Sequence, residues 1–174
     1  MTIATLLFRN FAAMKIQKTN VARLLEKAKI QFELIPYEVD ENDLSAGHIA
    51  SQLNEDLRQV FKTLVLFGEK SKHFVCVVPG DSEVDLKKAA KVSGNKKVDL
   101  IAMKDLLPTT GYIRGGCSPI GMKKHFPTYV HASAQAYEYI YVSAGVRGLQ
   151  IKLSPQDLIN AANAQYADLT NNAD

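Results

Sequence analysis

Two apolar segments joined by a short polar connection constrain the fold more than any other feature of this sequence. Residues 62–67 (KTLVLF) and 73–78 (HFVCVV) have the composition of strands, and Gly68 to Lys72 separate them. This pattern predicts a β-hairpin. A parallel pairing would need a crossover of about a dozen residues or more, which this connection does not supply. We therefore expect a mainly antiparallel sheet.

The rest of the chain alternates between helical and extended patterns, which predicts a mixed α/β domain. Further strands are expected within 30–39, 128–130, 139–143 and 149–153. Four helices are expected to begin after residues whose side chains can cap a first turn, namely Thr19 or Asn20, Ser45, Asp85 and Ser154. Gly94 is expected to end the third of these helices, and the fourth is expected to bury Tyr166 on its apolar face.

The N-terminal segment, residues 1–13 (MTIATLLFRNFAA), is mostly apolar and precedes a second methionine, Met14. Its Arg9 follows the apolar residues, whereas the basic region of a secretory signal precedes them. We interpret 1–13 as an extension, with an organellar presequence as the alternative. One domain is expected over 14–174, because a chain of 174 residues, 47% of them hydrophobic, suffices for one core.

Composition excludes several classes of protein. No apolar run approaches the roughly 20 residues that cross a bilayer, so no membrane partner is expected. Two cysteines without a Cys-x-x-Cys pair exclude a disulfide scaffold and indicate a reducing cytoplasm. The net charge is 21 − 18 = +3, which suits a polyanionic partner but is too small for a DNA-binding arm.

No metal site, cofactor motif or nucleophilic triad is predicted. The four histidines (His48, His73, His125 and His131) do not repeat at a spacing that would aim two ligands at one ion. Cys76 lies in an apolar strand segment and is expected in the core. Cys117 lies in a glycine-rich loop and should be more accessible, but no general base accompanies its thiol in the sequence.

Three features have both a structural and a functional interpretation. The loop from Gly111 to Gly121 (GYIRGGCSPIG) is either a tight turn or a set of backbone N–H groups that can bind a carbonyl or an oxyanion. Lys62 either extends its ammonium to water or binds a carbonyl or phosphate group. The lysine pairs at 87–88, 96–97 and 123–124 either surround one mouth or are dispersed over the surface.

The ordered motifs VFKTLVLF, DLKKAAK, TGYIRGGCSPIGMKKHFPTYVHA and IYVSAGVRGLQIKL, with the closing helix, resemble the YbaK/EbsC family of aminoacyl-tRNA deacylases. The resemblance extends from about Thr19 to Leu169 and implies a single domain with a barrel-like sheet surrounded by helices. It implies an essential lysine at Lys62. The substrate-binding residues that it implies are Tyr37, Thr63, Gly115, Gly116, Cys117, Ser118, Pro119, Ser143 and Gln150. Gln150 replaces an acidic residue of the family, and glutamine keeps a carbonyl acceptor but carries no charge.

The resemblance also implies a reaction: hydrolysis, in trans, of cysteine wrongly loaded onto proline tRNA, with Cys-tRNA(Cys) as a further substrate. Such editing is needed because cysteine and proline are similar in volume, so a binding pocket alone separates them poorly. The implied mechanism uses the substrate's own thiol and no protein nucleophile. The implied partners are the acceptor end of tRNA(Pro) and prolyl-tRNA synthetase, in the cytoplasm. Two alternatives stay open: a deacylase for another residue such as alanine, and a non-catalytic module that binds tRNA or a synthetase.

Overall fold

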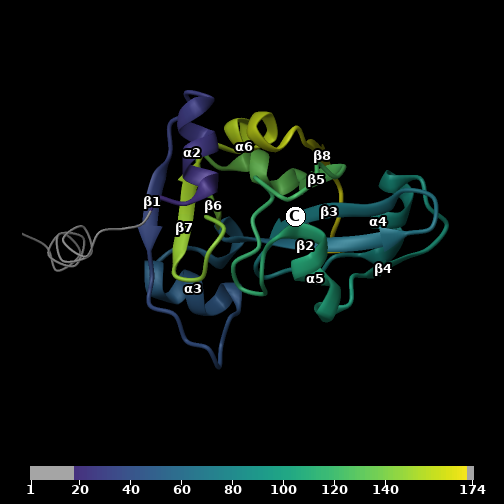
Figure 1. The fold of residues 1–174 in the computed structure, drawn as a ribbon, viewed down its shortest axis with the longest axis horizontal. Helices are drawn as coiled ribbons and strands as arrows, with labels where there is room; N and C mark the ends of the chain where they lie inside the picture. The colour runs from purple at the N-terminus through teal and green to yellow at the C-terminus, as the bar shows by residue number, and fades with distance from the viewer. Residues whose placement is uncertain (1–17, 172–174) are drawn as a thin grey trace, which may run out of the picture.

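The structure, a computed structural model, describes residues 18–171 and contains two β-sheets, one on each side of the view in Figure 1. The three-stranded sheet has the order β1 (Glu33–Pro36), β7 (Leu149–Leu153), β6 (Ile140–Ser143). The five-stranded sheet has the order β4 (Val98–Leu100), β2 (Phe61–Gly68), β3 (Lys72–Pro79), β5 (Thr128–His131), β8 (Gln165–Ala167).

The predicted hairpin is confirmed: β2 and β3 pair antiparallel, with Gly68 opposite Lys72. The expectation of a mainly antiparallel sheet is also confirmed, since four ladders are antiparallel and two, β3–β5 and β5–β8, are parallel. The barrel-like closure is not confirmed. The strands form two separate sheets, and an isolated parallel bridge between Val60 and Tyr141 connects them.

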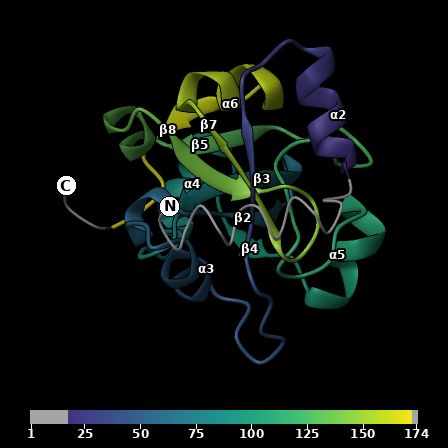
Figure 2. The same cartoon turned by 90° about the vertical axis from the view of Figure 1, so that its left-hand side faces the viewer.

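The predicted helix starts are confirmed. The side chains of Thr19, Ser45, Asp85 and Ser154 each accept a hydrogen bond from a backbone N–H of the first turn. The helices that they cap are α2 (Asn20–Lys27), α3 (Ala46–Leu53), α4 (Leu86–Ser93) and α6 (Pro155–Ala162). In Figure 2, α6 and α3 lie at opposite edges of the molecule. Gly94 ends α4 in the left-handed conformation, at φ +76°, as predicted.

The last helix is shorter than predicted, and Tyr166 does not belong to it. Asn163 adopts the left-handed conformation, at φ 49°, and ends α6, so the chain can turn and continue as β8. Tyr166 packs against the main core from β8, beside Val130 of β5. Four other elements of the described residues were not predicted: the strand β4, the helix α5 (Met103–Thr110) and the 3-10 helices η1 (Leu57–Gln59) and η2 (Ala132–Ala136).

The two faces of β2 cover different cores. Phe61 and Val65 point into the main core, which α2, the small sheet and α6 also fill. Leu66 points to the opposite face, where it packs with Phe74 and with Cys76, which is buried as predicted. Because side chains alternate along a strand, Thr63 is on the face of Phe61 and Val65, and Lys62 is on the face of Leu66.

Within the described residues, no helix is long and apolar enough to span a bilayer. The extension expected at 1–13 lies outside the described residues.

Candidate active site

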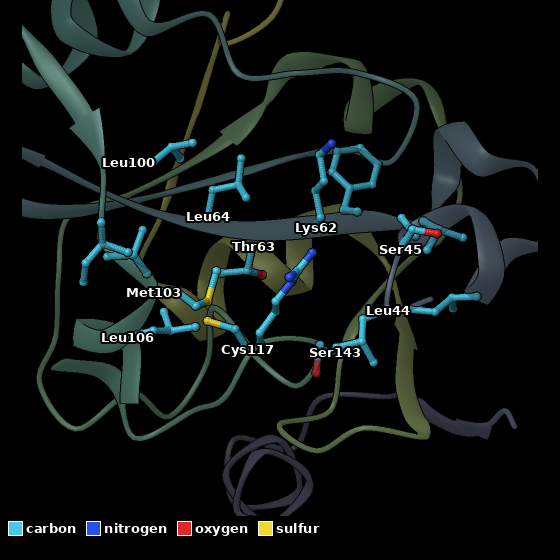
Figure 3. A pocket seen from close by; sticks show the side chains of 18 of the residues that line it. Leu44, Ser45, Lys62, Thr63, Leu64, Leu100, Met103, Leu106, Cys117 and Ser143 are labelled. Carbon is cyan, nitrogen blue, oxygen red and sulfur yellow. The ribbon is translucent and has the colours of Figure 1, made fainter. Parts of the chain in front are cut away.

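A cavity of about 330 Å³ lies beside β2, between α3, α5, the loop at 114–117 and the strands β6 and β7 (Figure 3). This volume is at the lower end of the range for small-molecule sites, about 300–1,000 Å³. Apolar side chains form most of its wall: Leu44, Ala46, Ile49, Val60, Phe61, Leu64, Val65, Leu100, Ile101, Met103 and Leu106. A wall of this kind excludes water and leaves the few polar groups to orient a ligand.

Two buried polar atoms at the cavity have no hydrogen-bond partner within residues 18–171. They are Oγ1 of Thr63 and Oε1 of Gln150. Gln150 is only 2% exposed and lies on β7 opposite Ser143 of β6, which also lines the cavity. A buried acceptor without a donor typically costs about 1–3 kcal/mol. Gln150 is therefore a lining residue whose acceptor no group of residues 18–171 uses.

Positive charge at the cavity comes from Lys62 and Arg114, and no carboxylate of the described residues lines it. The Lys62 side chain is 26% exposed, and its ammonium lies 3.4 Å from Oε1 of Glu83, a residue that is 92% exposed. In Figure 3 the Lys62 side chain leaves β2 in the direction away from Cys117 and Ser143. Lys62 is thus a cation at the rim of the cavity, and its present partner is a solvated carboxylate that an anionic ligand can replace.

The glycine loop reaches the cavity through Gly115 and Cys117. The N–H of Gly116 donates to the carbonyl of Ile113 at 3.0 Å and closes the turn, so this donor is already used. Within residues 18–171, the N–H groups of Gly115, Cys117 and Ser118 have no hydrogen-bond acceptor. The loop therefore serves as a tight turn and also leaves backbone donors of the kind that bind an oxyanion.

Among the described residues, the side chains that line the cavity include no activated nucleophile. Burial raises the pKa of the Cys117 thiol to about 12, so the thiol stays protonated near neutral pH. Among the lining hydroxyls, Ser45 donates a hydrogen bond to the carboxylate of Asp43. That hydrogen bond holds the pKa of Asp43 below its ordinary value, which makes the carboxylate a weak base. A reaction at this site must take its nucleophile from the substrate or from water.

The structure brings six of the residues proposed from the resemblance to the cavity: Lys62, Thr63, Gly115, Cys117, Ser143 and Gln150. The other four do not line it. Tyr37 packs with Ile49 and Tyr141 in a separate apolar cluster, Gly116 and Pro119 are buried, and Ser118 is 0% exposed. The hydroxyl of Ser118 accepts from the N–H of Ile120, so its side chain supports the loop.

Several lining residues were missed by the sequence analysis. Arg114 lies within the glycine-rich loop but was not singled out, and Ser45 was expected only as a helix cap. Met103 and Leu106 belong to α5, which carries no side-chain cap and contains Pro108. No motif marks Met103 and Leu106, because their place at the cavity depends on where the fold puts α5.

Substitution of Gly115 tests whether the loop needs a residue in the left-handed conformation at this position. Its φ is +85°, and a Cβ would lie 3.2 Å from Nε of Arg147 and 3.3 Å from Cδ2 of Leu44. We expect Gly115→Ala to lower the free energy of unfolding by about 1–2 kcal/mol, the cost of a left-handed L-residue. Urea denaturation measures this change in the free energy of unfolding. The matched control is Gly47→Ala within α3, whose Cβ would make only ordinary contact and whose stability should stay equal or rise by up to about 1 kcal/mol. Equal effects of the two substitutions would contradict this account of the loop.

Comparison with known proteins gives three relevant similarities. The model of the aminoacyl-tRNA editing domain family matches residues 41–161. EbsC of Enterococcus faecalis, named as a candidate Cys-tRNA(Pro)/Cys-tRNA(Cys) deacylase, is 51% identical over 154 residues, which are 88% of this chain and 94% of that protein. The crystal structure of a candidate trans-editing enzyme for prolyl-tRNA synthetase superposes with a TM-score of 0.77 at 23% identity, over 90% of this chain and 100% of that one. A likeness at this identity concerns the fold.

Proposed function

The chain belongs to the aminoacyl-tRNA editing domain family, and on that premise we propose that it removes cysteine from mischarged Cys-tRNA(Pro) in trans. The similarity to EbsC covers most of both chains and supports the same substrate class, including Cys-tRNA(Cys). We place the reaction in the cytoplasm, with prolyl-tRNA synthetase as the partner that delivers the mischarged tRNA.

One observation supports this function above the others: an apolar cavity with unpartnered polar atoms and no nucleophile or strong base of its own. Most ester hydrolases activate a side chain or a water molecule with such a base. A cysteinyl ester does not need one, since its own thiol lies close to its carbonyl carbon. An intramolecular attack of this kind has an effective molarity on the order of 10⁵ M or more when it is well aligned.

The proposed reaction is a cyclisation followed by hydrolysis. The thiol sulfur bonds to the ester carbonyl carbon, the bond from that carbon to the ribose oxygen breaks, and the thiol proton ends on that oxygen. Free tRNA and a cyclic thioester of cysteine result, and water opens the thioester to cysteine. Proline has no thiol, so a correctly loaded Pro-tRNA(Pro) that enters the cavity stays intact. Chemistry, and not pocket size, then separates two amino acids of similar volume.

Each group at the cavity has a task in this reaction. The apolar wall folds the cysteinyl group and excludes water. The N–H groups of Gly115 and Cys117 stabilise the negative charge that develops on the carbonyl oxygen. Lys62 and Arg114 hold the terminal phosphate or ribose of the tRNA at the rim. Gln150 accepts a hydrogen bond from the α-ammonium group, which supplies the donor that Oε1 lacks in the free protein.

The direct test of the function is a deacylation assay with the purified chain, Cys-tRNA(Pro) and Pro-tRNA(Pro), with and without prolyl-tRNA synthetase. We expect release of cysteine well above the spontaneous rate and no release of proline. Salt-dependent binding of both tRNAs without ester cleavage would instead favour the non-catalytic module.

Gln150→Leu should separate function from stability. The substitution removes a buried acceptor that has no partner, so the free energy of unfolding should stay equal or rise. The same substitution removes the acceptor for the α-ammonium, so we expect KM for Cys-tRNA(Pro) to rise on the order of tenfold, as for a lost hydrogen bond to a charged group. Urea denaturation and steady-state kinetics measure the two effects. Gln150→Glu is the control, because its carboxylate still accepts from an ammonium. A loss of stability with unchanged KM would contradict the assignment.

A further inference from the structure

A second hollow, of about 470 Å³, lies at the far end of the large sheet and carries three exposed lysines. Lys70 comes from the β2–β3 turn, and Lys96 and Lys97 lie between α4 and β4. Gly94, Asn95 and Glu69 complete its lining. None of the three lysines forms an ion pair within residues 18–171, whereas Lys62, Lys88 and Lys152 all do. The hollow thus carries three positive charges that no carboxylate of the described residues neutralises in an ion pair.

The lysines stand on a rigid frame centred on Asn95. Its Oδ1 accepts from the N–H groups of Lys70 and Ser71, at 2.9 and 3.1 Å. Its Nδ2 donates to the hydroxyls of Ser71 and Ser93, at 2.7 and 2.8 Å. The Asn95 side chain also packs so closely on Gly68 that no Cβ could fit there. The β2–β3 turn and the end of α4 are therefore fixed to each other, which presets the spacing of Lys70 from Lys96 and Lys97.

The strand β4 connects this hollow directly to the candidate active site. Lys97 precedes Val98, the first residue of β4, and the last residue of the strand, Leu100, lines the 330 Å³ cavity. β4 pairs with β2 along its length, from Gly68 opposite Val98 to Leu66 opposite Leu100. At about 3.3 Å per residue, Lys97 lies about 10 Å along the strand from the cavity wall. Stacked nucleotides repeat about every 3.4 Å, so this spacing corresponds to about three nucleotides.

We propose that the hollow of Lys70, Lys96 and Lys97 binds backbone phosphates of the RNA whose aminoacylated 3′ end occupies the cavity. The proposal rests on the proposed function, because that function places an RNA terminus beside Leu100. An RNA strand presents one negative charge per nucleotide, and three unpaired ammonium groups against one carboxylate, Glu69, match it. The contact is independent of sequence, since lysine reads phosphate as a point charge. It makes the hollow a second anchor that aligns the tRNA while the ester is cleaved.

The test compares two variants that lose the same charge. Lys96→Gln with Lys97→Gln removes two lysines of the hollow, and Lys27→Gln with Lys29→Gln removes two exposed lysines at α2, which lies at the opposite end of the molecule in Figure 1. Binding of uncharged tRNA(Pro) is measured against salt, and deacylation is measured with Cys-tRNA(Pro) and with a short substrate, cysteinyl-adenosine, which has no internucleotide phosphate. We expect the hollow variant to weaken tRNA binding on the order of tenfold at low salt and to reduce the salt slope by about 2. Its rate with cysteinyl-adenosine and the behaviour of the control should match the unmodified protein.

Unchanged tRNA binding and salt slope would overturn the proposal while leaving deacylation of Cys-tRNA(Pro) intact. A defect that appears only when prolyl-tRNA synthetase is present would assign the lysines to a protein partner and would also overturn it. If the unmodified protein cleaves neither substrate, the proposed function fails, and the salt dependence with uncharged tRNA still decides whether the hollow binds RNA. Lys96→Arg with Lys97→Arg should restore binding, because it keeps both charges.

Discussion

Alanyl-tRNA(Pro) is expected to be deacylated on the order of 10³-fold more slowly than cysteinyl-tRNA(Pro), and seryl-tRNA(Pro) should be almost as slow as alanyl-tRNA(Pro). The reason is that the cavity contributes no nucleophile: the Cys117 thiol is protonated near neutral pH, and the carboxylate beside Ser45 is a weak base. With alanine only water can attack, and water is present at tens of molar, whereas an aligned thiol acts as if present at about 10⁵ M or more. Single-turnover deacylation of the three substrates, corrected for spontaneous hydrolysis, measures the ratio.

The pH dependence provides an independent check on the same mechanism. The thiolate is the reactive form, so the rate with cysteinyl-tRNA should rise about tenfold per pH unit up to the pKa of the substrate thiol, about 8.5 when unperturbed. Burial against the apolar wall disfavours a thiolate, as it does for the Cys117 thiol, so the plateau should begin above that value. Cys117→Ala is the control and should keep the rate and its pH profile. Comparable rates for cysteinyl- and alanyl-tRNA, or loss of activity in Cys117→Ala, would contradict substrate-assisted cleavage.

Elements with a local cause were predictable from the sequence. The hairpin needs only two apolar strands and a short turn, and α4 needs only the cap at Asp85 and the left-handed Gly94. The parallel ladder between β5 and β8 could not be found in this way. It pairs Tyr129 with Gln165, although β6, β7 and α6 lie between them in the sequence. A strand of three residues carries no local pattern that indicates its pairing partner. The missing barrel closure has the same cause, because sheet closure is decided by contacts distant in sequence.

The residues of the site also differ in whether the sequence alone could identify them. Lys62 and Gly115 stand in motifs, so the resemblance identified them from the sequence. Arg114 and Met103 were not found, because only the fold brings the glycine loop and α5 to the same cavity as β2. The position of Gln150 was assigned, but its physical role was not, because a missing hydrogen-bond partner is a property of three-dimensional packing. The structure also divides the lysine pairs: 96–97 gathers with Lys70 around one hollow, while Lys88 pairs with Asp168.

Lys62→Met is expected to reduce kcat/KM for Cys-tRNA(Pro) by roughly 100-fold, because the variant loses a charged contact that holds the terminal phosphate or ribose and positions the ester. Methionine keeps the apolar stem that lies on the cavity rim, so the substitution removes the ammonium without opening the wall. Steady-state kinetics with Cys-tRNA(Pro) and with cysteinyl-CCA measure the effect on both substrates. Lys62→Arg should recover part of the activity because it keeps the charge.

The partner of Lys62 decides how this result is interpreted. In the free protein its ammonium faces Glu83, whose carboxylate is almost fully solvated, so the ion pair contributes little and breaks easily. Glu83→Gln should therefore leave the deacylation rate equal or slightly raised. In this variant the Lys62 ammonium does not have to leave a carboxylate before it binds the phosphate of the tRNA. If Lys62 only held Glu83 in place, Glu83→Gln and Lys62→Met would instead reduce the rate to the same extent. Near-normal turnover by Lys62→Met would remove the lysine from the mechanism, and the burden of binding the terminal phosphate would then fall on Arg114.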